Sequence, residues 1–100
     1  MKLRDIAHTR TGDKGNRSTL SVIAHDIRDF ERLAAQLTAE RVKAHYDGIV
    51  RGRVERFLLP QLGALQFVLH DALAGGVTRS LALDAHGKTL SSHLLNIDIE

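Results

Sequence analysis

The apolar residues of this chain change their spacing several times, and these changes constrain the fold more than any other feature of the sequence. Segments in which apolar and polar residues alternate predict strands, because neighbouring side chains of a strand point to opposite faces. Segments in which apolar residues recur every three or four positions predict helices. Both kinds occur within only 100 residues, a length that supports one hydrophobic core but not two. We therefore expect a single domain over residues 1–100.

The spacing predicts nine elements in the order β-β-α-α-β-α-β-α-β. The expected strands span 3–9, 18–25, 50–59, 77–84 and 95–99, and the expected helices span 26–36, 38–48, 62–74 and 88–94. Thr38 is suited to cap the second helix, and Pro60 is suited to end the third strand. Interleaved helices and strands in one small domain predict a two-layer α/β sandwich built on a mixed sheet.

Composition excludes several classes of protein. The chain is 43% hydrophobic and 26% charged, which is ordinary for a globular domain. It contains no cysteine, so disulfides and cysteine-based metal sites are excluded and a reducing cytoplasmic location is expected. No apolar run approaches the roughly 18 residues of a membrane span, and no signal peptide is expected. The formal net charge is +2 with only four aromatic residues, a pattern that does not favour nucleic-acid binding.

Residues 10–17, with the sequence RTGDKGNR, hold the densest group of side chains suited to binding. We expect them to form a loop between the first two strands, since glycine, aspartate and asparagine favour turns. The glycines would let the backbone approach a ligand, and Arg10, Lys14 and Arg17 would add positive charge for a phosphate or carboxylate. A solvated hairpin loop, in which Asp13 bonds its own backbone, is the alternative.

A second candidate segment spans residues 75–80 and has the sequence GGVTRS. Its glycines fit either the end of a helix or the wall of an anion site. Arg79 has the same strand parity as the apolar residues around it, so it either forms a structural ion pair or meets an anion.

His70 is the candidate acid or base, since the pKa of histidine lies near neutrality; Asp71 or Asp13 would be its partner. The alternative is a favourable charge near a helix C-terminus. The six histidines show no metal-ligand spacing, and no standard nucleotide-binding fingerprint occurs, so we expect neither a metal nor a cofactor.

Seven segments in order resemble one known family. They are 10–16 (RTGDKGN), 22–24 (VIA), 37–42 (LTAERV), 50–56 (VRGRVER), 67–73 (FVLHDAL), 75–81 (GGVTRSL) and 84–90 (DAHGKTL). This series is similar to the small domain at the C-terminus of acyclic terpene utilisation A (AtuA) proteins, which also occurs as a separate protein. The resemblance covers residues 3–99 and implies a ferredoxin-like α+β fold. It also implies a context of bacterial catabolism of branched acids as CoA thioesters.

These observations give three hypotheses for function. The first is a binding or accessory subunit that takes a small anionic, phosphate-bearing ligand such as an acyl-CoA. The second is a small acyl-CoA hydratase or isomerase that uses His70, and the third is a subunit that only assembles with a larger acyl-CoA-processing enzyme. A homo-oligomer or a partner protein is expected in each case, because a two-layer sandwich leaves one sheet face open. The expected ligand-binding residues are Arg10, Asp13, Lys14, Asn16, Arg17, Arg79 and Ser80.

Overall fold

The computed structural model describes residues 1–14, 17–46, 50, 52–70 and 94–100. Four strands carry the fold: β1 (Ala7–Lys14), β2 (Arg17–Ala24), β3 (Val54–Leu59) and β4 (Ala64–His70). Two short helices, α1 (Phe30–Gln36) and α2 (Ala39–His45), lie between β2 and β3 along the chain. Three 3-10 turns complete the described elements: η1 (Leu3–Asp5), η2 (Ile27–Asp29) and η3 (Pro60–Leu62).

The four strands form one sheet in the order β1-β2-β4-β3. Every neighbouring pair is antiparallel. The α+β, two-layer expectation is confirmed, but the described strands do not form the mixed sheet that the sequence predicted. The reason is the length of the connections: β1 reaches β2, and β3 reaches β4, through only a few residues, and connections this short join antiparallel strands.

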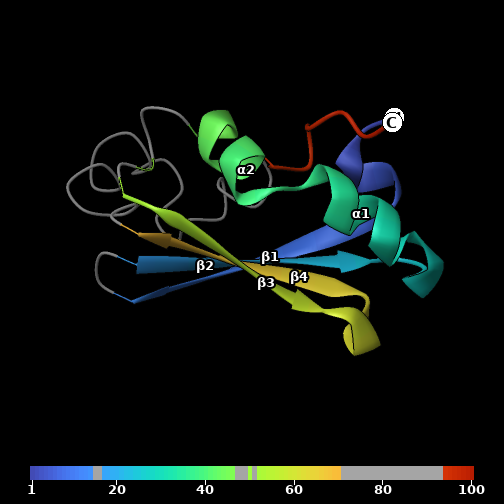
Figure 1. Cartoon of the computed structure of the whole chain (residues 1–100), viewed down its shortest axis with the longest axis horizontal. Helices are drawn as coiled ribbons and strands as arrows, with labels where there is room; N and C mark the ends of the chain where they lie inside the picture. The colour runs from blue at the N-terminus through green and yellow to red at the C-terminus, as the bar shows by residue number, and fades with distance from the viewer. Residues whose placement is uncertain (15–16, 47–49, 51, 71–93) are drawn as a thin grey trace.

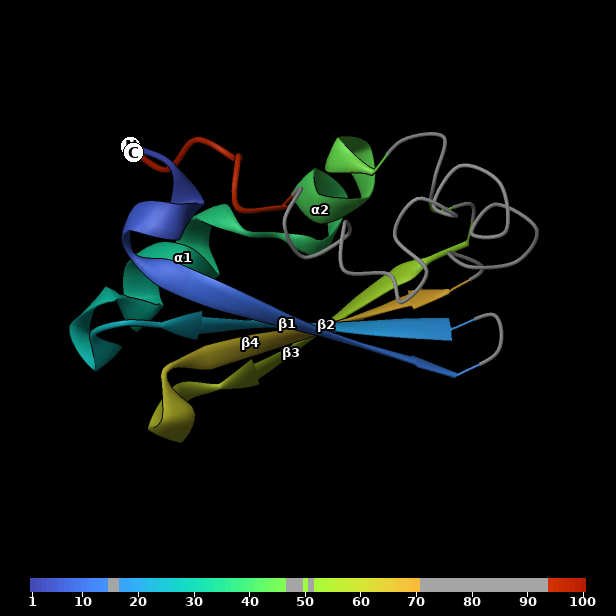
Figure 2. The same cartoon turned by 180° about the vertical axis from the view of Figure 1, so that it is seen from behind.

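Both helices cover the same face of the sheet, which we call the inner face (Figures 1 and 2). The opposite, outer face carries no described α-helix. The alternating burial of β2 and β4 follows from this arrangement, because every second residue points to the helices. The buried apolar side chains of both layers form one core cluster, whose largest fully buried members are Tyr46, Phe67, Leu3, Leu20, Leu33, Leu37, Leu65, Leu69, Leu94 and Ile99.

Local sequence explains where the helices begin. Asp26 accepts a hydrogen bond from the backbone N–H of Arg28 and so starts η2, which leads into α1. Thr38 accepts one from the N–H of Arg41 and starts α2, as the sequence predicted. The helices expected over 26–36 and 38–48 are therefore present, although each is shorter than expected.

The helix predicted over 62–74 is wrong for its described residues, because Ala64–His70 form the central strand β4, and residues 71–74 lie outside the described part of the chain. Gly63 adopts a left-handed conformation with φ of 63°, which ends η3 and turns the chain into the strand. Leu65, Phe67 and Leu69 point into the core, and Val68 lies on the other face. A strand with apolar residues on both faces reads as a continuous apolar run, and such a run also satisfies a helical spacing.

The loop predicted over 10–17 is also wrong over most of its length. Arg10 to Lys14 continue β1 and pair in regular register with Arg17 to Ser21. Glycine and aspartate suggested a loop here, but the backbone hydrogen bonds of the ladder outweigh their weak local preference. Residues 15 and 16 lie outside the described part of the chain.

The two ends of the chain differ from the expected strands 3–9 and 95–99. Residues 3–5 form η1 before β1 begins, and the C-terminal segment contributes a single bridge between Lys2 and Asp98. Leu3 N–H donates to the carbonyl of Ile97 over 2.8 Å, so the two ends lie side by side. The strand expected over 77–84 and nearly all of the helix expected over 88–94 fall outside the described residues.

Candidate functional site

A row of basic residues crosses all four strands at one end of the sheet. Lys14 on β1 pairs with Arg17 on β2, and Arg17 pairs with His70 on β4. The N–H of His70 donates to the carbonyl of Arg53, the residue that precedes β3, over 3.0 Å. We call these four residues the basic row. Directly opposed residues of neighbouring strands lie about 4.5–5.5 Å apart at their Cα atoms, so the register alone brings these positions together.

Two members of the basic row reach solvent, and a further cation lies on the same face of the sheet. Arg17 is exposed, and the Arg53 side chain is 74% exposed. Arg10, which is also exposed, pairs with Ser21 on β2 in the register of the hairpin. Like charges opposed across a sheet are destabilising unless an anion offsets them, so a row of this kind favours an anionic partner.

His70 is hydrogen-bonded to a carboxylate of the same sheet face. Its Nε2 lies 2.5 Å from Oε2 of Glu55 on β3, and the His70 side chain is 27% exposed. Arg53 Nε lies 3.7 Å from the same oxygen. The hydrogen bond from His70, with a smaller contribution from Arg53, holds the pKa of the Glu55 carboxyl below its ordinary value of 4.5. Glu55 therefore stays ionised and orients the imidazole.

Gly52 fixes the backbone beneath this pair. Its N–H donates to the carbonyl of His70 over 3.0 Å. A Cβ atom at position 52 would lie 2.6 Å from that carbonyl oxygen, so only glycine allows this approach without a shift of the backbone. The close contact holds the start of β3 against the end of β4 and so sets the distance between Glu55 and His70.

The structure describes some of the expected site residues and not others. Arg10, Asp13, Lys14 and Arg17 lie on the β1–β2 hairpin, and His70 lies at the end of β4 beside it. Asn16, Arg79 and Ser80 lie outside the described residues, as does Asp71, one of the two expected partners of His70. The other expected partner, Asp13, pairs with Ser18 and lies one position away from the basic row.

Glu55 and Arg53 are site residues that the sequence prediction missed. Their parity on the third strand indicated a polar face, but nothing in the sequence connected that face to His70. The misassigned helix over 62–74 removed β4 from the expected sheet, and with it the neighbour that brings Glu55 to His70.

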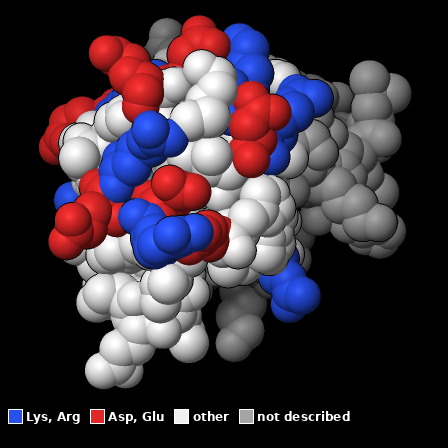
Figure 3. Space-filling model, turned by 90° about the vertical axis from the view of Figure 1, so that its right-hand side faces the viewer, with Lys and Arg blue, Asp and Glu red and all other residues white. Residues whose placement is uncertain are grey.

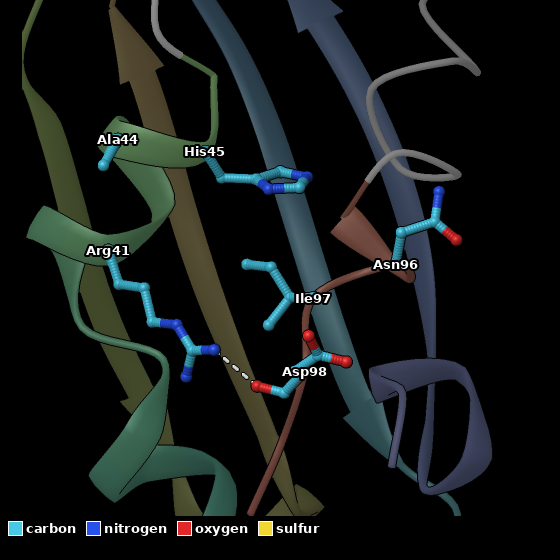
Figure 4. Close-up of a pocket in the computed structure, with 6 residues that line it drawn as sticks. All are labelled: Arg41, Ala44, His45, Asn96, Ile97 and Asp98. Atoms are coloured by element: carbon cyan, nitrogen blue, oxygen red, sulfur yellow. Dashed lines mark hydrogen bonds between the residues drawn. The ribbon is translucent and has the colours of Figure 1, made fainter.

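A separate hollow of about 400 Å³ lies between α2 and the C-terminal segment (Figure 4). It is lined by Arg41, Ala44, His45, Asn96, Ile97 and Asp98. The guanidinium of Arg41 donates to the carbonyl oxygens of Asp98 and Gln36, and the Asp98 carboxylate pairs with Lys2 over 2.9 Å. The Lys2 ammonium lowers the pKa of Asp98. The charged groups of this hollow therefore hold the C-terminal segment in place.

Among the residues that the structure describes, no three side chains of His, Asp or Glu come together to hold a metal ion. His8 and His25 stack with ring centroids 5.6 Å apart, but they are two ligands only. None of the described helices has the length and apolar character required to cross a bilayer.

The two-layer architecture and the antiparallel sheet define a small α+β domain of the ferredoxin-like class. The model of the AtuA ferredoxin-like domain family matches residues 1–100. The chain belongs to this family, which confirms the resemblance seen in its sequence motifs. The comparisons with curated proteins and with solved structures give no match.

Proposed function

We propose that the basic row and Arg10 form a binding site for a small anionic, phosphate-bearing ligand. The observation that supports the proposal most is the register that aligns Lys14, Arg17, His70 and Arg53 across four strands. Arginine can hold a phosphate through two parallel hydrogen bonds, and lysine adds a point charge. Glu55 is the one described carboxylate in contact with the row, and it orients His70 rather than neutralising the whole group.

The ligand we propose is an acyl-CoA, with the protein acting as a cytoplasmic accessory subunit in branched-acid catabolism. This choice rests on the context that the family resemblance implies. The phosphates of CoA would suit the basic row. Asp13 and Asn16 would order the hairpin, and Arg79 and Ser80 would provide the remaining wall of the site.

Thermal unfolding in the presence of candidate ligands tests this proposal. The panel contains CoA, acyl-CoA esters and inorganic phosphate, measured on the wild type, Lys14→Ala, Arg17→Gln and Arg79→Gln. A ligand at about 100 times its Kd adds about 2.7 kcal/mol to the free energy of unfolding. In a domain of this size such a gain raises Tm by many degrees. The expected result is a rise with acyl-CoA that is much smaller in the Arg17→Gln and Lys14→Ala proteins.

A matched control separates a site from general attraction of anions to a basic protein. Arg32→Gln removes the same charge from the exposed side of α1, far from the basic row. It should leave the ligand-induced rise in Tm unchanged. The proposal fails if no compound raises Tm, or if Arg32→Gln reduces the rise as much as Arg17→Gln does. Co-purification with a larger enzyme in the absence of any ligand effect would favour a pure assembly subunit.

The contact between Glu55 and His70 favours a second candidate, an enzyme that hydrates or isomerises an acyl-CoA. An ionised carboxylate that orients an imidazole is a common arrangement for general acid–base catalysis. This candidate requires turnover that follows a sigmoid or bell-shaped dependence on pH. Activity should be lost in His70→Gln, and Glu55→Gln should displace the pH profile. Turnover that persists unchanged in His70→Gln would remove the candidate.

A further inference from the structure

Among the described strands, β1 and β3 lie at the two edges of the sheet, and β3 exposes apolar side chains on both of its faces. Phe57 and Leu59, on the outer face, are 48% and 38% exposed. Leu58 points to the inner face and is nevertheless 45% exposed. A strand at the edge of a sheet usually carries charged residues or a bulge that prevents further pairing. Apolar residues on both faces are instead typical of a strand with neighbours on both sides.

The apolar character continues beyond the strand. Pro60, Gln61 and Leu62 of η3 carry no charge, and Leu62 is 69% exposed. Figure 3 looks at this end of the molecule: most of the Lys, Arg, Asp and Glu side chains gather over its upper part, and the region at the lower left, where η3 lies, is uncharged. β3 carries two charged residues, and both are bonded within the chain: Arg56 extends across the inner face to the carbonyl oxygens of Ala34 and Leu37, and Glu55 bonds to His70 on β4.

The backbone of β3 also has hydrogen-bonding groups directed to its open side. The carbonyl of Arg53 accepts from His70 on β4, so by the alternation of an antiparallel ladder Glu55, Phe57 and Leu59 also bond to β4. The N–H and carbonyl groups of Arg56 and Leu58 then point away from β4. No described strand pairs with them.

We propose that β3 pairs with β3 of a second copy of this chain, antiparallel and about a two-fold axis, to make one continuous sheet of both copies. A two-fold dimer uses the same surface on each copy, and an apolar edge fits an identical apolar edge. Residues opposed across such a pair must lie on the same sheet face, so their positions differ by an even number. The two-fold axis therefore passes through one residue of the strand and not between two residues.

Charge decides between the remaining registers. An axis at Glu55 or at Arg56 would place that residue opposite its own copy and bring like charges together, which is destabilising. An axis at Phe57 or Leu58 avoids this clash and brings the apolar residues of the two strands into contact. With the axis at Phe57, the two rings oppose each other, and Arg56 of each copy exchanges backbone hydrogen bonds with Leu58 of the other. The second copy is therefore a chemically matched occupant of this edge.

The test is the oligomeric state, measured by sedimentation equilibrium over a range of protein concentrations. The wild type should be a dimer at micromolar concentration. Phe57→Lys should weaken the dimer by at least about tenfold, because it places two ammonium groups at the shared edge. His8→Lys is the matched control: it introduces the same side chain on the outer face of the opposite edge strand and should leave the dimer intact. Circular dichroism verifies that each variant is folded.

A second variant and hydrogen exchange test the same pairing of β3 independently. Leu58→Pro removes only an N–H that points to the open side, so it should abolish the dimer while preserving the pairing of β3 with β4. In hydrogen exchange, the amides of Arg56 and Leu58 should be protected in the wild-type dimer and exchange rapidly in Phe57→Lys. A monomeric wild type at high concentration, or a dimer that survives both β3 changes, would overturn the proposal.

Discussion

Among the described strands, β1 and β3 form the two edges of the sheet, and their exposed side chains differ in polarity. On β1, His8, Arg10 and Gly12 occupy the outer face and are exposed, so this edge is polar and its basic groups oppose pairing with another strand. On β3, Phe57, Leu58 and Leu59 are exposed instead. The difference indicates that the β1 edge resists pairing with another strand and that the β3 edge is suited to such pairing.

The two edges also differ in how firmly they are attached to the rest of the molecule. β3 is held by Arg56, which bonds to carbonyl oxygens at the end of α1 and just beyond it, and by the close approach of Gly52 to His70. At the β1 edge, a Cβ atom added at Gly12 would meet only a side-chain atom, Oγ1 of Thr19, and no backbone atom. Mutations in matched pairs can therefore separate the roles of the two edges.

The largest expected effect on stability comes from replacing a phenylalanine. Phe67 on the central strand β4 is fully buried, and Phe67→Ala should lower the free energy of unfolding by about 3–5 kcal/mol. Phe57→Ala on the β3 edge should cost only about 1–2 kcal/mol in the monomer, because its ring is half exposed. Urea unfolding measures both values. If the edge is paired in solution, the cost of Phe57→Ala should increase with protein concentration, and a constant cost would contradict pairing.

The second largest expected effect on stability comes from replacing a glycine by alanine. Gly52→Ala places a Cβ against backbone atoms of His70, which cannot move independently, so we expect a loss of about 1–3 kcal/mol in stability. Gly12→Ala meets only Thr19 Oγ1, at 2.9 Å, and a side-chain rotation relieves this contact. Its effect should stay within about 1 kcal/mol of zero. Equal losses in the two variants, measured by urea unfolding, would show that the start of β3 is not tightly fixed.

Replacing an arginine on each edge strand should give a smaller difference in stability. Arg56→Met keeps the aliphatic stem but leaves the carbonyl oxygens of Ala34 and Leu37 without their charged donor. We expect a loss of about 2 kcal/mol, since hydrogen bonds to charged groups contribute about 1.5–3 kcal/mol. Arg10→Met on the β1 edge removes an exposed charge and should change stability by less than about 0.5 kcal/mol. A similar loss at both positions would argue against the anchoring role of Arg56.

The smallest effect depends on pH. The pKa of Glu55 is lower in the folded protein than its ordinary 4.5, so ionised Glu55 favours folding at neutral pH. This contribution is present above pH 4.5 and is lost as the pH falls through the folded-state pKa. Glu55→Gln should therefore be less sensitive to acid than the wild type in thermal unfolding measured from pH 7 to pH 3.

A double variant identifies the cause of that pH dependence. The hydrogen bond from His70 is the largest cause of the lowered pKa of Glu55. In a His70→Gln background, the change Glu55→Gln should consequently have a smaller effect on the acid limb of the stability profile. Identical effects in both backgrounds would mean that the contact between the two side chains does not couple them in solution.

The residue pattern was sufficient to predict a two-layer fold, the β1–β2 hairpin and the two helices, because their apolar residues follow a single period and Thr38 marks a helix start. The α+β, ferredoxin-like class followed from the family resemblance. It was insufficient for β4. Leu65, Phe67 and Leu69 alternate as a strand requires, but Leu62, Val68 and the apolar residues that follow also fit a helix. Period alone cannot decide between the two, since the decision depends on hydrogen bonds to distant strands.

The same limit applies to the candidate site. Arg10, Lys14, Arg17 and His70 were recognised from their chemistry. The structure places Lys14, Arg17 and His70 at one end of the sheet and Arg10 in the middle of β1. The role of Glu55 was not predictable, because it arises from the pairing of β3 with β4 and not from any local motif. Partners that meet only through sheet register become visible when the strand order is known.

The contact between the two ends of the chain has a consequence for connectivity. The amino group of Met1 donates to the carbonyl of Ile99 over 3.0 Å, and the N–H of Ile99 donates to the carbonyl of Met1 over 2.7 Å. The backbone therefore almost closes into a ring. A few small residues could join these ends, and the ring could be opened at an exposed turn such as η3 without removing any described strand pair. The fold would then form whichever residue came first in the chain. Because its two ends lie side by side, the domain is suited to insertion within another chain.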